Sequence, residues 1–271
     1  MSMSGEAGNG RQAQRHPFHE ARRRARTGFP RWLAILAAWS LVSLAGCSDE
    51  PLAQGSRPSD ASASPEVGAP LDPGPTILTE GSEALAAGTY VLDLYAGHPN
   101  DERFPNIEIT VPDGWSNLDG WGVTTGSESG SRWMGITFWD VDEVYRHPCD
   151  GSETIQPGRT VTDLASALAE QPLREASQPV DLTIDGHAGV QMGWSVPADF
   201  DFSTCDDGYF DSWTDVGGGG RYQQGPGQVD RLWILDVDGE RLVVDAMYMP
   251  SADAKDRKEL WRVMETIRFQ S

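Results

Sequence analysis

Alternating apolar and polar residues predict a series of β-strands from Ile77 onward. Residues 89–93 and 107–111 are rich in β-branched and aromatic side chains, and the second run is stopped by Pro112-Asp113-Gly114. Residues 132–141 hold a dense set of large aromatic and aliphatic side chains, which predicts a strand near the middle of a sheet. The pattern therefore favours a sheet as the framework of the domain.

Two Asp-Gly pairs predict β-hairpins. Asp185-Gly186 joins residues 182–184 to residues 190–196, and Asp238-Gly239 joins residues 232–237 to residues 241–247. An Asp-Gly pair between apolar runs suits the left-handed backbone that a two-residue hairpin turn requires. The two strands of each pair are expected to be antiparallel neighbours.

Two segments show helical spacing of apolar residues. The first begins with Thr160 and Asp163, which resemble a capping box, and ends before Pro172. The second is capped by Ser251 or Asp253. The apolar residues that share one face are Leu164, Ala167 and Leu168 in the first helix and Leu260, Val263, Met264 and Ile267 in the second.

These elements predict an α+β fold. A mostly antiparallel sheet with two hairpins is expected to be covered on one face by the two helices, and residues 267–269 are expected to form a short final strand. Residues 77–271 are long enough to form one globular domain with its own core. Residues 48–76 consist almost wholly of Pro, Gly, Ala, Ser, Asp and Glu, so they cannot bury enough surface to fold and are expected to form a disordered tether.

The amino terminus has the order of an export signal. Seven arginines precede an apolar run, residues 33–45, which is shorter than the roughly 20 residues needed to cross a bilayer. The run ends in Leu44-Ala45-Gly46-Cys47, which resembles a bacterial lipobox. That resemblance implies that residues 1–46 are a signal peptide, that the Cys47 thiol carries a diacylglycerol, and that residues 47–76 join this anchor to the domain. It also implies an extracytoplasmic, lipid-anchored location at the cell membrane, and it leaves open the export route and the true translation start.

The composition is strongly acidic. The chain has 21 basic and 41 acidic residues, and loss of residues 1–46 leaves 14 basic and 39 acidic residues, a net charge of −25. Such a surface repels nucleic acid, so no nucleic-acid partner is expected. It also repels anionic lipid, so membrane attachment must come from the acyl chains on Cys47.

With Cys47 acylated, two cysteines remain. Cys149 and Cys205 are expected to form a disulfide, because an exported chain enters an oxidising compartment. A Cys/His metal site would need closely spaced ligands such as C-x-x-C, and only His147 stands near either cysteine.

From Gly88 to its end the chain resembles a type of domain found in exported bacterial proteins of unassigned activity. The matching pieces are Gly88-Thr89-Tyr90, the strand end Val111-Pro112-Asp113-Gly114-Trp115, the central helix and hairpin, and a last helix that closes on Ile267-Arg268-Phe269. This order is similar to the Mog1/PsbP-like α/β fold. The resemblance implies interaction or assembly roles and carries over no catalytic residues; the acidic segment between Asp199 and Asp215 departs from the pattern.

No catalytic motif is present in the sequence. The hydrolase motifs G-x-S-x-G and S-x-x-K are absent, as are H-E-x-x-H and the Lys-Ser/Thr of a phosphate-binding loop. The mature chain has three histidines, His98, His147 and His187, each in a predicted loop or turn where a solvated side chain is expected. The protein is therefore not expected to be an enzyme.

One acidic segment suggests a cation site. Carboxylates around Cys205 could supply the oxygen ligands that Ca²⁺ prefers, but Thr204 and Phe210 stand where an EF-hand needs glycine and glutamate. A solvated acidic loop is therefore the favoured interpretation, so no cofactor is expected and calcium is the alternative. The candidate ligands are Asp199, Asp201, Asp206, Asp207 and Asp211, with Asp215 at the end of the segment.

Tryptophan is unusually frequent. Most of these residues occupy alternating positions in predicted strands and are interpreted as core, whereas Trp121 and Trp213 stand among Gly, Ser and Asp and are predicted to be exposed ligand anchors. The sequence thus favours a lipid-anchored, extracytoplasmic, non-catalytic domain that binds an envelope protein or a small molecule. A secreted cell-envelope hydrolase and a structural envelope-assembly lipoprotein are the alternatives, and the oligomeric state stays open.

Overall fold

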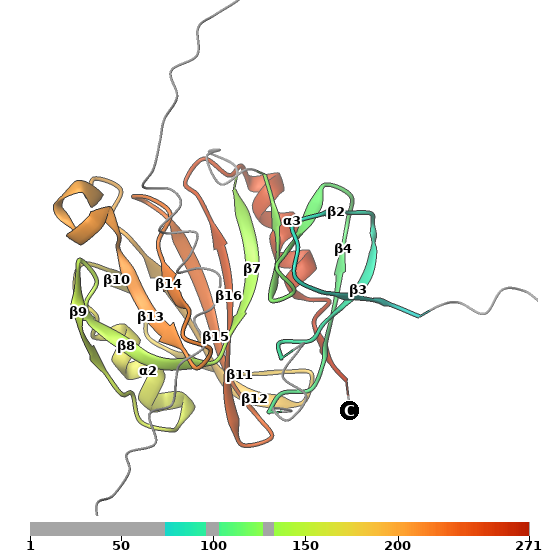
Figure 1. The fold of residues 1–271 in the computed structure, drawn as a ribbon, viewed down its shortest axis with the longest axis horizontal. Coiled ribbons are helices and arrows are strands. Elements are labelled where there is room, and N and C mark those ends of the chain that lie inside the picture. The colour runs from blue at the N-terminus through green and yellow to red at the C-terminus, as the bar shows by residue number, and fades with distance from the viewer. Residues whose placement is uncertain (1–73, 96–102, 127–132, 271) are drawn as a thin grey trace, which may run out of the picture.

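The computed structural model describes residues 74–95, 103–126 and 133–270 (Figure 1). The predicted signal peptide, the lipidation site Cys47 and residues 47–73 of the predicted tether lie outside these ranges. His98 also lies outside them.

A central sheet of nine strands dominates the part of the chain that the structure describes. Its order is β10-β12-β15-β16-β7-β6-β5-β2, with β11 also paired to β12. All of these pairs are antiparallel. The strands are β2 (Ala84–Leu85), β5 (Trp115–Leu118), β6 (Gly122–Thr125), β7 (Met134–Trp139), β10 (Glu175–Ala176), β11 (Val180–Ile184), β12 (His187–Ser195), β15 (Val229–Val237) and β16 (Glu240–Tyr248).

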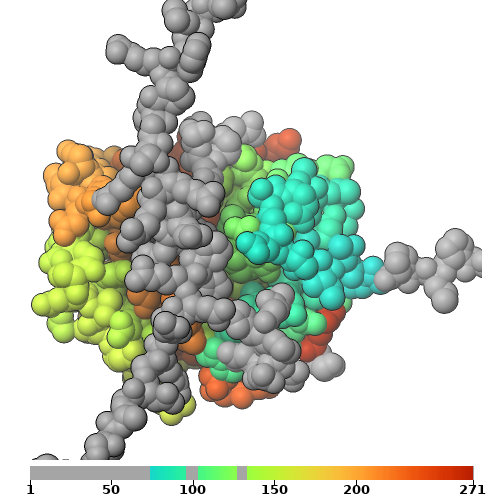
Figure 2. Space-filling view, viewed as in Figure 1, coloured from blue at the N-terminus to red at the C-terminus, as the bar shows by residue number. Residues whose placement is uncertain are grey.

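Two four-stranded sheets flank the central one. The first has the order β1-β3-β4-β17 and the second the order β14-β13-β8-β9. In the space-filling view the cyan segment that holds β1 and β3 of the first sheet, and the yellow-green and orange segments that hold strands of the second, lie on opposite sides of the visible face (Figure 2). Their strands are β1 (Thr76–Leu78), β3 (Gly88–Leu92), β4 (Ile107–Val111) and β17 (Arg268–Phe269), then β8 (Val141–His147), β9 (Asp150–Ile155), β13 (Asp211–Asp215) and β14 (Gly220–Tyr222).

The predicted α+β class and both predicted hairpins are confirmed. β11 pairs with β12 through Asp185-Gly186, and β15 pairs with β16 through Asp238-Gly239. The turn residues have φ values of 47° and 91° in the first hairpin and 56° and 92° in the second. This is the left-handed backbone that Asp and Gly tolerate in such turns.

The aromatic-rich residues 132–141 include β7, which lies in the middle of the central sheet, as predicted. β7 lies between β6 and β16, and all six of its residues are buried. The chain leaves the central sheet at Asp140 and enters β8 of the second flanking sheet.

The two helices lie on opposite faces of the central sheet, so the prediction that both cover one face is wrong. α2 (Val161–Ala169) packs Leu164 and Leu168 into a core with Leu232 and Ile234. α3 (Ala254–Met264) packs Leu260, Val263 and Met264 into a core with Trp233 and Leu235. Because successive residues of a strand point to opposite faces, the alternation along β15 separates the two cores.

Candidate ligand-binding groove

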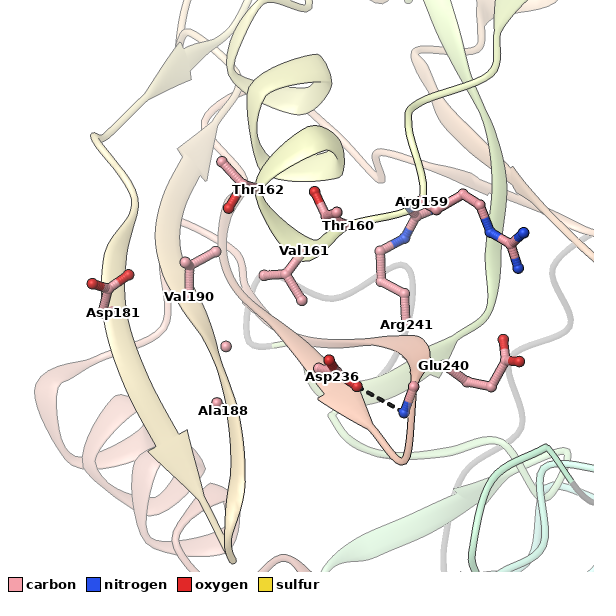
Figure 3. A pocket seen from close by; sticks show the side chains of 12 residues that line it. Arg159, Thr160, Val161, Thr162, Asp181, Ala188, Val190, Asp236, Glu240 and Arg241 are labelled. Atoms are coloured by element: carbon pink, nitrogen blue, oxygen red, sulfur yellow. Dashed lines mark hydrogen bonds between the residues drawn. The ribbon is translucent and has the colours of Figure 1, made fainter.

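An open groove lies where the first turn of α2 overhangs the ends of four strands of the central sheet (Figure 3). We call it the α2 groove. Its volume is about 450 Å³, and its lining comes from β11, β12, β15, β16 and α2. Neighbouring strands lie about 4.8 Å apart, so the groove spans roughly 14 Å across the sheet. This is room for about four residues of extended peptide or a molecule of similar size.

The groove has an apolar floor and a charged rim. Val161 of α2 points into it, and Ala188 and Val190 of β12 lie below (Figure 3). Asp181 stands at one end, and Arg159 with Glu240 stands at the other. A cleft of a few hundred Å³ with an apolar surface and a few polar groups is the usual form of a ligand site.

The start of α2 is fixed by a reciprocal capping box. Thr160 Oγ1 accepts from the Asp163 backbone N–H at 3.1 Å, and Asp163 Oδ2 accepts from the Thr160 N–H at 3.0 Å. These hydrogen bonds from Thr160 lower the pKa of Asp163. The predicted capping box is confirmed, and it holds Val161 at its position over the groove.

Arg241 ties the loop before α2 to the sheet. Its guanidinium donates to the carbonyl of Gly158 and to the carbonyl of Val141, the latter at 3.1 Å. Burial lowers the pKa of this guanidinium. The arginine therefore acts on the backbone, and it shapes the wall of the groove.

The turn between β15 and β16 forms the lower side of the α2 groove in Figure 3. Asp236 Oδ1 accepts from the Gly239 backbone N–H at 2.8 Å, as the dashed line in Figure 3 shows. This carboxylate is held by its own turn. Asp181 of β11, in contrast, is exposed, and its carboxylate has no hydrogen bond or ion pair with any other described residue. It is the rim carboxylate that is open to a ligand.

The predicted exposed position of Trp213 is wrong. Trp213 is fully buried, with its ring 5.6 Å from that of Trp194 and 5.9 Å from that of Trp139. β13 turns this side chain inward against the central sheet, although its sequence neighbours are polar. The two predicted anchors therefore do not form a common binding surface.

Trp121 is half-buried beside a second, much smaller hollow of about 40 Å³. Its ring lies 4.7 Å from that of Trp139, and Trp133 and Tyr222 also line the space. That volume is close to the space of a single water molecule. The hollow is too small to hold a ligand of ordinary size, so the α2 groove is the better candidate.

The acidic segment forms two short 3-10 turns, η1 (Phe202–Thr204) and η2 (Asp206–Gly208), before β13. Asp201 caps η1 by accepting from the Ser203 N–H at 2.9 Å, and this contact lowers its pKa. Asp211 is buried. Across the described ranges no group of three or more His, Cys, Asp or Glu side chains is placed to hold a metal ion, so the five calcium candidates Asp199, Asp201, Asp206, Asp207 and Asp211 do not converge.

Cys149 and Cys205 form the predicted disulfide, which joins the β8–β9 turn to the acidic segment. Phe200, Phe202 and Phe210 pack beside it, with ring centroids 5.0 to 5.8 Å apart. The disulfide and this aromatic cluster connect the segment to the β8–β9 turn.

A network of buried charges lies on the α2 side of the central sheet. Arg221, only 4 % exposed, donates to Asp230 and to Asp245, each at 2.8 Å. Burial, followed by the neighbouring carboxylate of Asp245, raises the pKa of Asp230 to about 7. Arg174 stacks on the Trp194 ring at 3.5 Å and donates to Ser212 Oγ at 2.7 Å, and burial lowers its pKa well below the ordinary value.

Sequence reasoning missed both the groove and this network. The groove is a gap between elements that were predicted individually, and no local pattern marks such a gap. Isolated acidic residues in apolar strands, such as Asp230 and Asp245, were the one available signal of a buried ionic network.

No protein-family description and no curated protein sequence matches the chain. Among solved structures, it is similar to LpqN involved in cell envelope biogenesis of Mycobacterium tuberculosis, with a TM-score of 0.36, 12 % identity and coverage of 68 % of this chain and 91 % of that one. It is also similar to the PsbP protein CyanoP from Synechocystis sp. PCC 6803, with a TM-score of 0.33, 14 % identity and coverage of 72 % and 99 %. Likeness at these scores carries no argument about family or function, so the Mog1/PsbP-like resemblance stays a prediction.

None of the helices in the described ranges is long and apolar enough to span a membrane.

Proposed function

We propose that this protein is a lipid-anchored, extracytoplasmic binding domain without catalytic activity, and that it takes its ligand in the α2 groove. The observation that carries the proposal is the groove itself. It has the volume and the apolar floor of a ligand site, and several of the polar groups around it serve the fold, whereas the carboxylate of Asp181 is open to a ligand. Thr160 and Asp163 cap α2, Asp236 closes a turn, and Arg241 binds backbone carbonyls.

The proposed anchor is the diacylglycerol on Cys47. Two acyl chains hold a protein stably on a membrane, whereas one chain holds it only marginally. A flexible tether of this length has a root-mean-square span of about 30 Å, enough to present the domain to ligands away from the lipid surface.

Thermal unfolding of the mature protein tests the binding site. Cell-wall oligosaccharides, apolar small molecules and short peptides of either charge are added in turn. A ligand present at a hundred times its dissociation constant raises the free energy of unfolding by about 2.7 kcal/mol. For a domain of this size, this corresponds to a rise of a few degrees in Tm. The expected result is a rise with one of these ligands that is abolished by Ala188→Trp, which fills the groove. A rise that survives Ala188→Trp would place the ligand elsewhere.

The anchor is tested by feeding expressing cells an alkyne-tagged palmitate. The wild-type chain is expected to take up the tag and to sediment with membranes, and Cys47→Ser is expected to do neither. Membrane association of an unlabelled Cys47→Ser chain would contradict the proposed anchor.

A further inference from the structure

The geometry points to an extended, cationic peptide segment as the partner of the α2 groove, added as a further strand along the free edge of β11 with the side chains of one face directed over Asp181 toward the groove. This inference rests on the proposed function, because it names the partner of the same groove. It has three supports, namely the open hydrogen-bonding edge of β11, the exposure of that edge, and the unpartnered carboxylate of Asp181.

The hairpin fixes which backbone groups of β11 are free. Among the described residues β11 pairs only with β12, from Val180 opposite Gln191 to Ile184 opposite His187. In a two-residue hairpin the pair that flanks the turn exchanges hydrogen bonds, and bonded and non-bonded pairs then alternate. Ile184, Leu182 and Val180 therefore direct their N–H and C=O groups to β12, while Thr183 and Asp181 direct theirs to the free edge.

The edge is open to solvent. Val180 is 63 % exposed, and Asp181 and Thr183 are also exposed. Unpaired N–H and C=O groups on an exposed edge are the template for an added strand. Pro179 directly precedes β11, and because proline has no N–H it limits the length of pairing to about five residues.

The edge and the groove are continuous through Asp181. Its side chain lines the groove, and its cross-strand neighbour Val190 forms part of the floor. An added strand would lie about 4.8 Å from β11, with alternate side chains on the groove side. A basic side chain on the groove side of the added strand, opposite Asp181, would reach the Asp181 carboxylate. The net charge of −20 on the whole chain further attracts a cationic peptide.

Charge also argues against a second copy of this chain as the occupant. Two β11 edges paired about a two-fold axis would bring the acidic strand, with Asp181 and Asp185, against itself. Like charges on directly opposite strands are destabilising. A partner strand with basic residues has the complementary charge.

The test uses the mature protein and a fluorescein-labelled decapeptide of alternating Lys and Val. Two control decapeptides have five Lys followed by five Val, or alternating Glu and Val. Fluorescence anisotropy is expected to show binding of the alternating Lys-Val peptide and at least about tenfold weaker binding of both controls. Equal binding of the two lysine peptides would overturn strand addition, because only nonspecific charge attraction is indifferent to alternation.

Thr183→Pro is the decisive variant. It removes an N–H that points away from β12, so the hairpin ladder is kept, and it is expected to weaken binding about tenfold. Thr183→Ala is the matched control and should bind within about twofold of wild type. Amide hydrogen exchange in the wild-type protein gives a readout without any variant, since the amides of Asp181 and Thr183 should exchange more slowly when the Lys-Val peptide is bound.

The same variants separate this inference from the proposed function. If Ala188→Trp abolishes peptide binding while Thr183→Pro leaves it unchanged, the groove binds ligands but strand addition is wrong. If oligosaccharide or an apolar molecule binds in a way that Ala188→Trp prevents, and no peptide binds, the proposed function stands and the peptide assignment falls. If sedimentation shows a dimer that Thr183→Pro dissociates, the occupant is a second copy and the assignment is overturned.

Discussion

Arg221 and Asp245 form an ion pair inside the protein, with Arg221 Nε 2.8 Å from Asp245 Oδ2 and the two side chains only 4 % and 0 % exposed. Asp230 binds the same guanidinium through Nη2, again at 2.8 Å. Burial alone would lower the pKa of Arg221, but the carboxylates of Asp245 and Asp230 have the larger combined effect, so the pKa of Arg221 is raised above its ordinary value. The arginine is therefore charged and joins β14 to β15 and β16.

Replacing Arg221 is expected to be strongly destabilising. Arg221→Met keeps much of the side-chain volume but leaves Asp230 and Asp245 buried without their cation. Removal of one partner from a buried pair typically costs about 3–5 kcal/mol. Urea unfolding measures this, and the matched control is Arg146→Met, whose partner Glu153 lies 3.4 Å away on the surface. That exposed pair should contribute at most about 1 kcal/mol. Equal losses in both variants would contradict the ionic role assigned to Arg221.

The stability of the protein is expected to fall as the pH rises from about 4 to about 7. The pKa of Asp230 is raised from 3.8 to about 7 by burial and by Asp245, so the folded state holds a proton over this range that the unfolded state has lost. A single such group gives a slope of at most about 1.4 kcal/mol per pH unit. Burial also raises the pKa of Asp140, which adds a change of the same sign.

Urea unfolding between pH 4.5 and 7.5 tests this slope. Asp230→Asn is expected to flatten it, because the amide oxygen can still accept from Arg221 and the titrating group is gone. Asp238→Asn, in the exposed turn of the β15–β16 hairpin, should keep the wild-type profile. If Asp230→Asn retains the full slope, a group other than Asp230 causes the dependence of stability on pH.

The elements that the sequence predicts well are those with local signals. Both hairpins follow from Asp-Gly pairs, and α2 begins at Val161, directly after its N-cap Thr160, because its capping box is complete within four residues. The face on which each helix packs has no such signal. β15 carries Leu232 and Ile234 on one face and Trp233 and Leu235 on the other, so both faces are apolar and either can accept a helix.

The site was harder to predict because it depends on long-range packing. Trp213 stands among polar residues in sequence, yet the packing of β13 on the central sheet buries it. No sequence motif marks Asp181, and only the position of α2 makes it the rim of a groove. Neither relationship can be read from neighbouring residues.

Trp213→Ala is expected to destabilise the protein by about 3–5 kcal/mol, because it leaves a large cavity between Trp139 and Trp194. Trp213→Phe should cost much less. The Trp213 indole N–H has no hydrogen-bond partner among the described residues, so phenylalanine loses only part of the ring volume. Urea unfolding of both variants distinguishes a core residue from the exposed anchor that the sequence suggested, since an exposed anchor would tolerate either change within about 0.5 kcal/mol.

Removal of the Cys149–Cys205 disulfide is expected to lower the free energy of unfolding by about 4 kcal/mol. The two cysteines are 56 residues apart, and the chain-entropy model gives this value for a loop of that length. The loss should appear in the Cys149→Ala/Cys205→Ala variant and, for the wild-type protein, in the presence of a reductant, whereas the reductant should not affect the variant. Because the disulfide pins the acidic segment beside Phe210 and lies apart from the α2 groove, ligand affinity measured at a temperature where both proteins are folded should be unchanged. A loss of affinity in the folded variant would mean that the acidic segment, and not the groove, holds the ligand.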